Sequence, residues 1–183
     1  MSSKTRQYKV GVLLIGLRGA GKSTIGPLLA ERLGMPFLDA DAAIEAAEEQ
    51  SVAELMAAGR FRTAEERVLG AILTKKGRVV AAGGGCVLWK GLTKAARDWR
   101  VVWLDAAPER LAERLAADAH PRPSLTGQDV HEEVAEVSLE RRPLYRKVAE
   151  VRVDTSDRKP EQLAAEIARI LLQEQPSESR CRE

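Results

Sequence analysis

The stretch "GLRGAGKST", from Gly16 to Thr24, decides the fold prediction. It directly follows the apolar run "VGVLLI", which predicts a buried strand, and it precedes apolar residues at helical spacing. Gly16, Gly21, Lys22 and Ser23 match the phosphate-binding pattern Gly-x-x-x-x-Gly-Lys-Ser. In such a loop, successive backbone N–H groups point at phosphate oxygens, and the N-terminus of the helix adds a partial positive charge. The stretch therefore favours a nucleotide-phosphate site over a simple glycine turn.

The loop also supplies the side chains that phosphate chemistry requires. Lys22 is expected to reach the β- and γ-phosphates of ATP, and the hydroxyl of Ser23 is expected to coordinate Mg²⁺. Arg18 adds a positive charge inside the loop, where transfer of a phosphoryl group needs one. The residues of this segment predicted to contact the nucleotide are Gly19, Ala20, Gly21, Lys22, Ser23 and Thr24.

The composition of the 183-residue chain is that of one ordinary globular domain, which we expect to span residues 1–173. Hydrophobic residues make up 44% of the chain and charged residues 31%, while aromatic residues make up only 4%. The 29 Lys and Arg residues nearly balance the 27 Asp and Glu residues, and a net charge of +2 gives no reason to expect a nucleic-acid or membrane partner. We expect a monomer with a small-molecule substrate and a disordered tail at 174–183.

The cysteines and the apolar segments bear on the cellular compartment. Cys86 and Cys181 form neither a disulfide framework nor a metal-binding pair, which fits a reduced, cytoplasmic setting. The first apolar run is too short for a signal peptide and leads straight into the glycine loop. No segment is long enough to span a bilayer.

Strand-like and helix-like segments alternate along the chain. The predicted strands lie at 9–16, 36–41, 77–85, 99–105 and 150–155. The predicted helices follow the glycine loop as far as Gly34, then lie at about 42–58, 61–73, 108–116 and 130–148, with a last one carrying Leu163, Ile167, Ile170 and Leu171 on one face. We expect Asp105 to cap the helix that starts at Pro108. The Pro- and Gly-containing segment at about 117–128 has the length and polarity of a lid.

This alternation predicts an α/β fold, a three-layer sandwich with a five-stranded parallel sheet covered by helices on both faces. Ligands of such folds bind beyond the carboxyl ends of the strands. The glycine loop, Asp39 and Asp41, the segment Gly83–Gly85 and Asp105 all follow predicted strands. We therefore expect them to gather at one edge of the sheet.

The two aspartates of "LDAD" have two possible roles. Beside a phosphate loop, one carboxylate can hold hydrated Mg²⁺ while the other accepts a proton from a hydroxyl nucleophile. Alternatively, one of them caps the following helix, which for Asp41 taken alone is about equally plausible.

Three glycines in a row, Gly83–Gly85, let a small ligand approach the backbone closely, although an ordinary turn remains an alternative. Arg62 and Arg141 are helical arginines, a kind of residue that is usually solvated. Glu65 lies one turn after Arg62 and can orient it. Arg122, in the lid segment, can close over ATP phosphates.

Other chemistry-bearing side chains receive no catalytic role. His120 and His131 have no partners at ligand spacing, and Cys86 is expected to be packed rather than reactive. The three tryptophans are expected in the core or at its boundary.

Together these features resemble the shikimate kinase family, over about residues 10–172. The motifs that carry the resemblance are "GLRGAGKST", "FLDADAAIE", "FRTAEE", "GGG", "RPSL", "RRPLYRKVA" and "VDTSDRKP". The resemblance implies a P-loop kinase fold with a lid, and transfer of the γ-phosphate of ATP to the 3-hydroxyl of shikimate. It also implies the composition of the acid pocket: Asp41, Arg62, Gly83, Gly84, Gly85 and Arg141.

The resemblance further implies how the nucleotide is held. Asp39 assists Ser23 at Mg²⁺, and Arg122 contacts ATP from the lid. The segment Asp157–Pro160, with Arg158 and Pro160, lies beside the adenine. Lys22, Asp41 and Arg18 are the implied catalytic residues.

Two departures from the family pattern stand out. The segment "GRFR", Gly59 to Arg62, lacks the glutamate that usually follows the glycine and is a few residues shorter, so Arg60 is an alternative to Arg62. The lid reads "RPSL", with Ser124 in place of a common leucine. Three rival functions stay open: a gluconate kinase or a related small-molecule kinase, a nucleotide-dependent binding module, and a weakly active paralogue.

Overall fold

The computed structural model describes residues 10–118 and 129–173. Its centre is a sheet of five strands in the order β2-β3-β1-β4-β5, and every neighbouring pair is parallel. The strands are β1 (Gly11–Ile15), β2 (Phe37–Asp39), β3 (Val79–Ala81), β4 (Trp99–Asp105) and β5 (Val151–Asp154). The predicted α/β fold with a five-stranded parallel sheet is confirmed.

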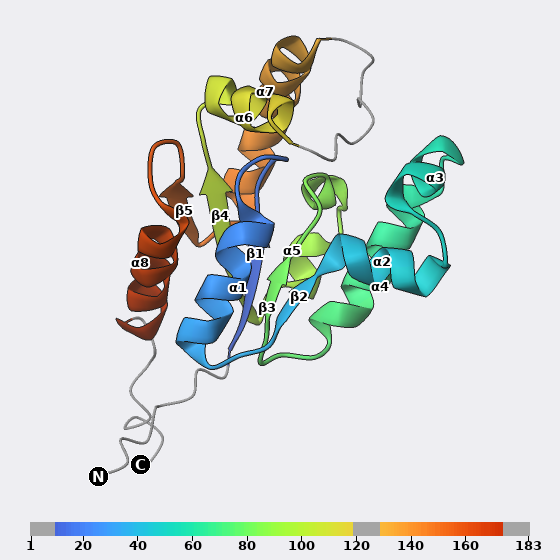
Figure 1. The fold of residues 1–183 in the computed structure, drawn as a ribbon. Helices are drawn as coiled ribbons and strands as arrows, with labels where there is room; N and C mark the ends of the chain where they lie inside the picture. The colour runs from blue at the N-terminus through green and yellow to red at the C-terminus, as the bar shows by residue number, and fades with distance from the viewer. Residues whose placement is uncertain (1–9, 119–128, 174–183) are drawn as a thin grey trace.

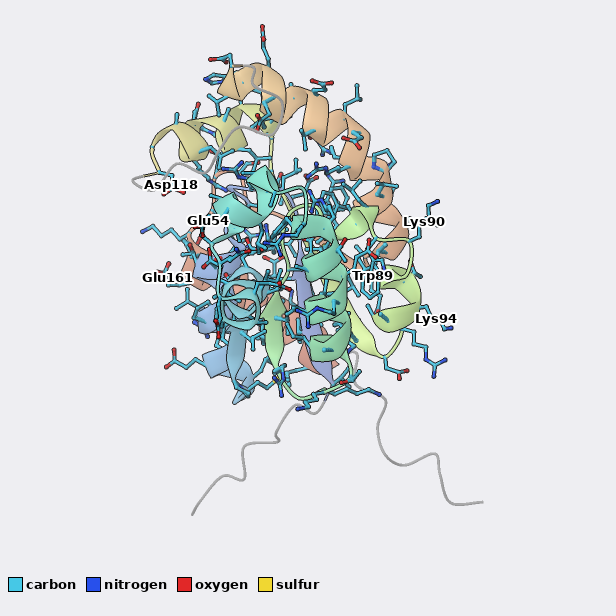
Figure 2. The ribbon with its side chains drawn as sticks, turned by 90° about the vertical axis from the view of Figure 1, so that its right-hand side faces the viewer. Glu54, Trp89, Lys90, Lys94, Asp118 and Glu161 are labelled. Atoms are coloured by element: carbon cyan, nitrogen blue, oxygen red, sulfur yellow. The ribbon has the colours of Figure 1, made fainter. Side chains whose placement is uncertain are left out.

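Helices cover both faces of this sheet. They are α1 (Lys22–Leu33), α2 (Ala40–Glu48), α3 (Val52–Ala57), α4 (Phe61–Leu73), a 3-10 turn η1 (Cys86–Leu88), α5 (Leu92–Ala95), α6 (Pro108–Ala116), α7 (Val130–Val148) and α8 (Pro160–Gln173). Helices α1 and α8 pack together on one face, and the connections through α4, α5 and α7 run over the other (Figure 1). In Figure 2, Glu161 of α8 and Lys94 of α5 lie on opposite sides of the sheet. Two faces are used because the crossover from β1 to β2 runs toward one edge of the sheet, whereas the later crossovers run toward β5 at the other edge. Right-handed connections that run in opposite directions lie on opposite faces.

The position of the glycine loop follows from that of the central strand β1, which it directly succeeds. All five residues of β1 are buried between β3 and β4, as the apolar run predicts for a strand covered on both faces. The chain then turns through Gly16 to Gly21 into α1. Gly21 caps α1 with a φ of 89°, and Gly34 ends it with a φ of 64°, as predicted.

The predicted helix at about 42–58 is wrong, because the chain forms two helices there. Glu49 follows α2 with a φ of 53°, a left-handed conformation that stops the helix. Ser51 then opens α3 with a capping box: its hydroxyl accepts from Glu54 N, and the Glu54 carboxylate accepts from Ser51 N. The Ser-x-x-Glu signal for this second start was present in the sequence.

The prediction that Asp105 caps the helix at Pro108 is also wrong. The residue before α6 is Ala107, and no side chain caps that helix. Asp105 is instead buried at the end of β4, where its Oδ2 accepts from Arg142 and Arg152, 2.7 Å from an Nη2 of each. The carboxylate forms ion pairs with two arginines that are distant in the chain, and helix periodicity cannot predict these contacts.

Helices α2 to α4 form a smaller core of their own beside the main one, with Ile44, Leu55 and Phe61 at its centre. Among the helices of the described residues, none is both long enough and apolar enough to cross a membrane. Arg122, Ser124, His120, Cys181, most of the lid segment and the tail at 174–183 lie outside the described residues.

Candidate active site

A cleft of about 520 Å³ opens at the carboxyl ends of the strands, where the sequence predicted ligands to bind. The glycine loop forms its floor, and the ends of β2 and β3 form one wall. The other wall comes from the end of α6 and from the segment between β5 and α8. The predicted site residues that line it are Arg18, Gly19, Ala20, Gly21, Lys22, Ser23, Thr24, Asp39, Asp41, Gly83, Gly84, Arg158 and Pro160.

The glycine loop has a shape that only glycine permits at several positions. Gly19 and Gly21 have φ values of 77° and 89°. A side chain at Gly16 would place its Cβ 2.2 Å from the carbonyl oxygen of Leu104. Lys22 Nζ donates to the carbonyls of Gly16 and Leu17, at 2.7 and 2.8 Å. The ammonium group is thus held at the loop itself, next to where the loop binds phosphate.

Asp39 joins the loop to the second strand. Ser23 Oγ donates to Asp39 Oδ2 at 2.7 Å, and the other carboxylate oxygen accepts from Asp41 N at 3.0 Å. Asp39, not Asp41, is therefore the aspartate that caps α2. Asp41 lies in the first turn of α2 and keeps its side chain in the cleft.

The oxygen ligands at Ser23 and Asp39 fit a magnesium ion. A hydroxyl and a carboxylate meet at the edge of the phosphate loop, and Mg²⁺ prefers such oxygen ligands, completing its shell with water and substrate phosphates. Across residues 10–118 and 129–173, no group of three or more Asp, Glu, His or Cys residues forms a metal cage. Mg²⁺ does not require one, because it is usually bound through one or two carboxylates.

The glycine turn Gly83–Gly85 is the place where the charged side chains of the second half of the site meet. A Cβ on Gly83 would lie 2.5 Å from Glu65 Oε1 and 3.0 Å from Asp41 Oδ1. A Cβ on Gly85 would lie 2.0 Å from Arg62 Nη1. Any side chain on this turn would displace these groups, so the turn is more than an ordinary connection.

Arg62 is oriented by Glu65, as the sequence suggested. Its Nη1 lies 2.5 Å from Glu65 Oε2, and the carboxylate is 3% exposed while the arginine is 40% exposed. Burial raises the pKa of Glu65 above its usual value, and the charge of Arg62 offsets part of that rise. The second carboxylate oxygen, Oε1, is buried and has no hydrogen-bond partner among the described residues. Arg60, the alternative to Arg62, is exposed and donates to Gln50.

Arg141 reaches the same turn from α7. The residue is buried, and its Nη1 donates to the carbonyl of Gly84 at 3.2 Å. Its Nε is also buried and makes no hydrogen bond within the described part of the chain. A hydrogen-bonding ligand at this turn could satisfy the buried donor of Arg141 and the buried acceptor of Glu65. Arg62, Arg141 and Gly85 do not line the cleft itself, but the two arginines contact the turn whose Gly83 and Gly84 line it.

Arg114 is a site residue that sequence reasoning missed. It projects from α6, and its Nη1 donates to Gly19 O at 3.1 Å. Its Nη2 donates to the carbonyls of Thr155 and Ser156, at 2.5 and 2.9 Å. Arg114 therefore ties the phosphate loop to the segment after β5. Nothing in the sequence distinguished it from the other helical arginines, since its partners are far away in the chain.

The neighbouring residues of the β5–α8 segment are partly tied to other side chains. Arg158, in the cleft wall, pairs with Glu166 of α8, and Asp157 pairs with Arg110 of α6 at 2.9 Å. Pro160 begins α8 and lines the same wall.

Two expectations of purely structural roles are confirmed. Cys86 is fully buried directly after the glycine turn, and burial raises the pKa of its thiol to about 12, so the thiol stays protonated. Trp99 and Trp103 are buried in the core and Trp89 lies at its boundary.

The strand–loop–helix unit, the strand order and the polar pocket beside the loop define a P-loop kinase fold for a small molecule. Within that class the comparisons with known proteins are specific. The family model described as "Shikimate kinase" matches residues 18–172, and the chain belongs to the shikimate kinase family.

The relatives agree with this assignment in sequence and in structure. The shikimate kinase of Rhodopirellula baltica is 42% identical over 162 residues, which cover 84% of this chain and 86% of that one. The shikimate kinase of Acinetobacter baumannii, solved in complex with shikimate, superposes with a TM-score of 0.88 at 30% identity, over 96% of this chain and all of that chain. A gluconokinase from Sinorhizobium meliloti has a TM-score of 0.64 at 21% identity, covering 92% of this chain and 94% of that one, and shares the fold alone.

Proposed function

We propose that the protein transfers the γ-phosphate of ATP to the 3-hydroxyl of shikimate, giving shikimate 3-phosphate and ADP. One observation carries the proposal: Arg62, Glu65 and Asp41 converge on the glycine turn that borders the phosphate-loop cleft. The shikimate complex of the Acinetobacter baumannii relative supports the same substrate.

The acid pocket suits a small carboxylate that carries several hydroxyls. Arg62 and Arg141 supply cationic donors for the carboxylate, because guanidinium groups pair with it in a fixed geometry. The backbone of Gly83, Gly84 and Gly85 allows a ring to approach closely. Asp41 lies beside this turn and accepts hydrogen bonds from substrate hydroxyls.

In the proposed transfer, Asp41 acts as the general base. It takes the proton of the 3-hydroxyl while the oxygen forms its bond to the γ-phosphorus. The bond between that phosphorus and the β–γ bridging oxygen breaks, and the electron pair leaves with ADP. Lys22 and Arg18 stabilise the charge on the transferred group, and Arg122 of the lid segment adds a third cation.

The nucleotide is held along the cleft. The backbone N–H groups of Gly19 to Thr24 bind the phosphates, and Arg158 and Pro160 lie at the adenine end. Ser23 and Asp39 would hold Mg²⁺, which when bound neutralises phosphate charge. The monomeric state and the cytoplasmic location stay predictions from the sequence.

The test is an ADP-release assay with ATP and either shikimate or gluconate as acceptor. We expect turnover that depends on shikimate, with the phosphate found on the 3-hydroxyl by ³¹P NMR. Turnover with gluconate and none with shikimate would overturn the proposal in favour of the rival small-molecule kinase. ATP binding without turnover on either acid would support the binding-module alternative.

A further inference from the structure

The carbonyl oxygen of Gly84, in the middle of the glycine turn, accepts two hydrogen bonds from α7. Tyr145 Oη donates to it at 2.5 Å, and Arg141 Nη1 donates to it at 3.2 Å. The two donors are four residues apart and therefore lie on one face of the helix. Tyr145 is fully buried.

The ring of Tyr145 is held on its other side by the core. It stacks on Trp103 with the ring centroids 5.7 Å apart and the planes at 21°. Trp103 is 1% exposed, and the guanidinium carbons of Arg152 and Arg142 lie 5.0 and 5.9 Å from its ring centroid. Both arginines are paired with the buried carboxylate of Asp105. The phenol thus has a position fixed by packing, which is what support for a site requires.

The glycine turn needs this support more than other segments do. Three consecutive glycines have the widest backbone freedom of any tripeptide, so their own sequence cannot hold one conformation. The groups of the acid pocket close on this turn within distances that leave no room for a Cβ. A shift of the Gly84 peptide would therefore move the surface that Arg62, Glu65 and Asp41 share.

We propose that Tyr145 is a positioning residue for the acid substrate: its hydroxyl fixes the Gly84 peptide and the acceptor that Arg141 uses. Tyr145 and Arg141 share this carbonyl oxygen as an acceptor, and the buried Nε of Arg141 makes no hydrogen bond within the described residues. The hydroxyl remains a donor at every working pH, since burial raises the pKa of Tyr145 well above its usual value. The identity of the acid rests on the proposed function.

The informative variant is Tyr145→Phe, which keeps the stacked ring and removes only the donor. We expect the KM for shikimate to rise about 5- to 50-fold, the effect of leaving a buried acceptor short of one hydrogen bond. The Kd for nucleotide should stay within about twofold of the wild-type value. The effect on kcat should be smaller than that on KM, because Tyr145 touches neither phosphate nor base.

Trp99→Phe is the matched control. Trp99 Nε1 is also a buried donor to a backbone carbonyl, that of Leu73 at 2.9 Å, but it lies at the start of β4, away from the cleft. This variant should lose stability and leave the KM for shikimate unchanged. Thermal unfolding of both variants shows whether each is folded at the assay temperature.

The outcomes separate the two proposals. A wild-type protein without activity on shikimate would overturn the proposed function and this inference together. An active wild type, with a Tyr145→Phe KM within twofold of normal, would overturn the inference alone. A KM for shikimate that rose equally in Trp99→Phe would mean that Tyr145 acts only through general packing. This result would also overturn the inference.

Discussion

Arg62 pairs with the buried Glu65 beside the glycine turn, whereas Arg60, two residues earlier, donates to Gln50 on the surface. The difference follows from where α4 begins. Gly59, with a φ of 66°, ends the previous turn, Arg60 precedes the helix, and Phe61 enters the small core of α2 to α4. Arg62 is then the residue directed at Gly85, so the shortened segment still places an arginine at the glycine turn.

We expect Arg62→Ala to weaken shikimate binding by about 2–4 kcal/mol, the range for removing one side of a charge-assisted pair. The loss is large because the carboxylate of the acid would face an unpaired Glu65. Isothermal titration of shikimate into the variant, with and without a nucleotide, measures it directly.

Arg60→Ala is the control and should change binding by less than about 0.5 kcal/mol, as surface substitutions usually do. A strong loss in Arg60→Ala with a weak one in Arg62→Ala would exchange the roles of the two arginines.

The buried carboxylate of Glu65 predicts a pH dependence of stability. Its pKa is raised by burial, so between the ordinary pKa and the raised one the folded chain holds a proton that the unfolded chain has released. The stability contributed by Glu65 is therefore fully present below about pH 4.3, the ordinary carboxyl pKa, and is lost as the pH rises through the raised value. The difference in unfolding free energy, wild type minus Glu65→Gln, should decrease across this window and then level off.

Urea unfolding at a series of pH values between 4 and 8 measures that difference. The exposed neighbour offers a matched variant, Glu66→Gln, which should follow the wild type at each pH. If the unfolding free energy of the wild type minus that of Glu65→Gln increased with pH, the site would stabilise the charged carboxylate and not destabilise it.

The sequence predicted the sheet, the loop and most of the residues that line the cleft because these have local signals. The phosphate loop has a fixed spacing, the strands have apolar runs, and α4 and α7 have the bounds that their periodicity predicted. The partners that the sequence missed act over long separations. Arg114 lies 95 residues from Gly19, and Tyr145 lies 61 residues from Gly84. Both are ordinary helical residues until the fold brings their backbone acceptors to them.

At Asp105 a local sequence signal gave a wrong prediction, because the partners of this residue are distant in the chain. Its position three residues before Pro108 suggested a cap, but a buried carboxylate at a strand end is stabilised more by two cations than by the free N–H groups of an exposed helix start. Tyr145 was within reach of sequence reasoning, since it lies four residues after Arg141 on the same helical face.

The Asp105 ion pairs predict a stability effect. Asp105→Asn should destabilise the fold by about 1–3 kcal/mol, less than a fully buried pair because Arg142 and Arg152 are 31% and 52% exposed. Equilibrium unfolding in urea gives the change. Asp98→Asn removes the carboxylate of an exposed pair with Lys76 and should leave the midpoint unchanged. Equal losses in both variants would mean that the burial of Asp105 has no energetic consequence.

Lys22→Ala should lower turnover by about 10²–10³-fold or more, because the ammonium stabilises charge on the transferred phosphoryl group. The fold should persist, since the hydrogen bonds of Lys22 Nζ to the carbonyls of Gly16 and Leu17 lie within the loop and not in the core. The comparison is with Lys94→Ala, which should keep full activity. Lys94 is an exposed lysine on α5 (Figure 2) and is not among the residues that line the cleft. An active Lys22→Ala enzyme with normal kcat would contradict the role of this loop.

The last prediction separates the two aspartates after β2. Asp39 is bound to Ser23 and caps α2, while Asp41 faces the glycine turn beside Glu65. Asn at position 41 keeps the size and part of the hydrogen bonding but cannot accept the proton. Asp41→Asn should therefore lower kcat by about 10²–10⁴-fold, the range for loss of a general base, with nearly unchanged nucleotide affinity.

Asp39→Asn should show the complementary pattern, because in the proposed function its carboxylate holds the metal together with Ser23 and does not contact the acid. Its nucleotide affinity should fall, and high Mg²⁺ should restore part of its activity. The measurement is kcat, the KM for shikimate and the nucleotide Kd of both variants across a Mg²⁺ titration. Rescue of Asp41→Asn by Mg²⁺, together with no rescue of Asp39→Asn, would show that the metal lies at Asp41. The base would then have to be another group beside the glycine turn, where the carboxylate of Glu65 also lies.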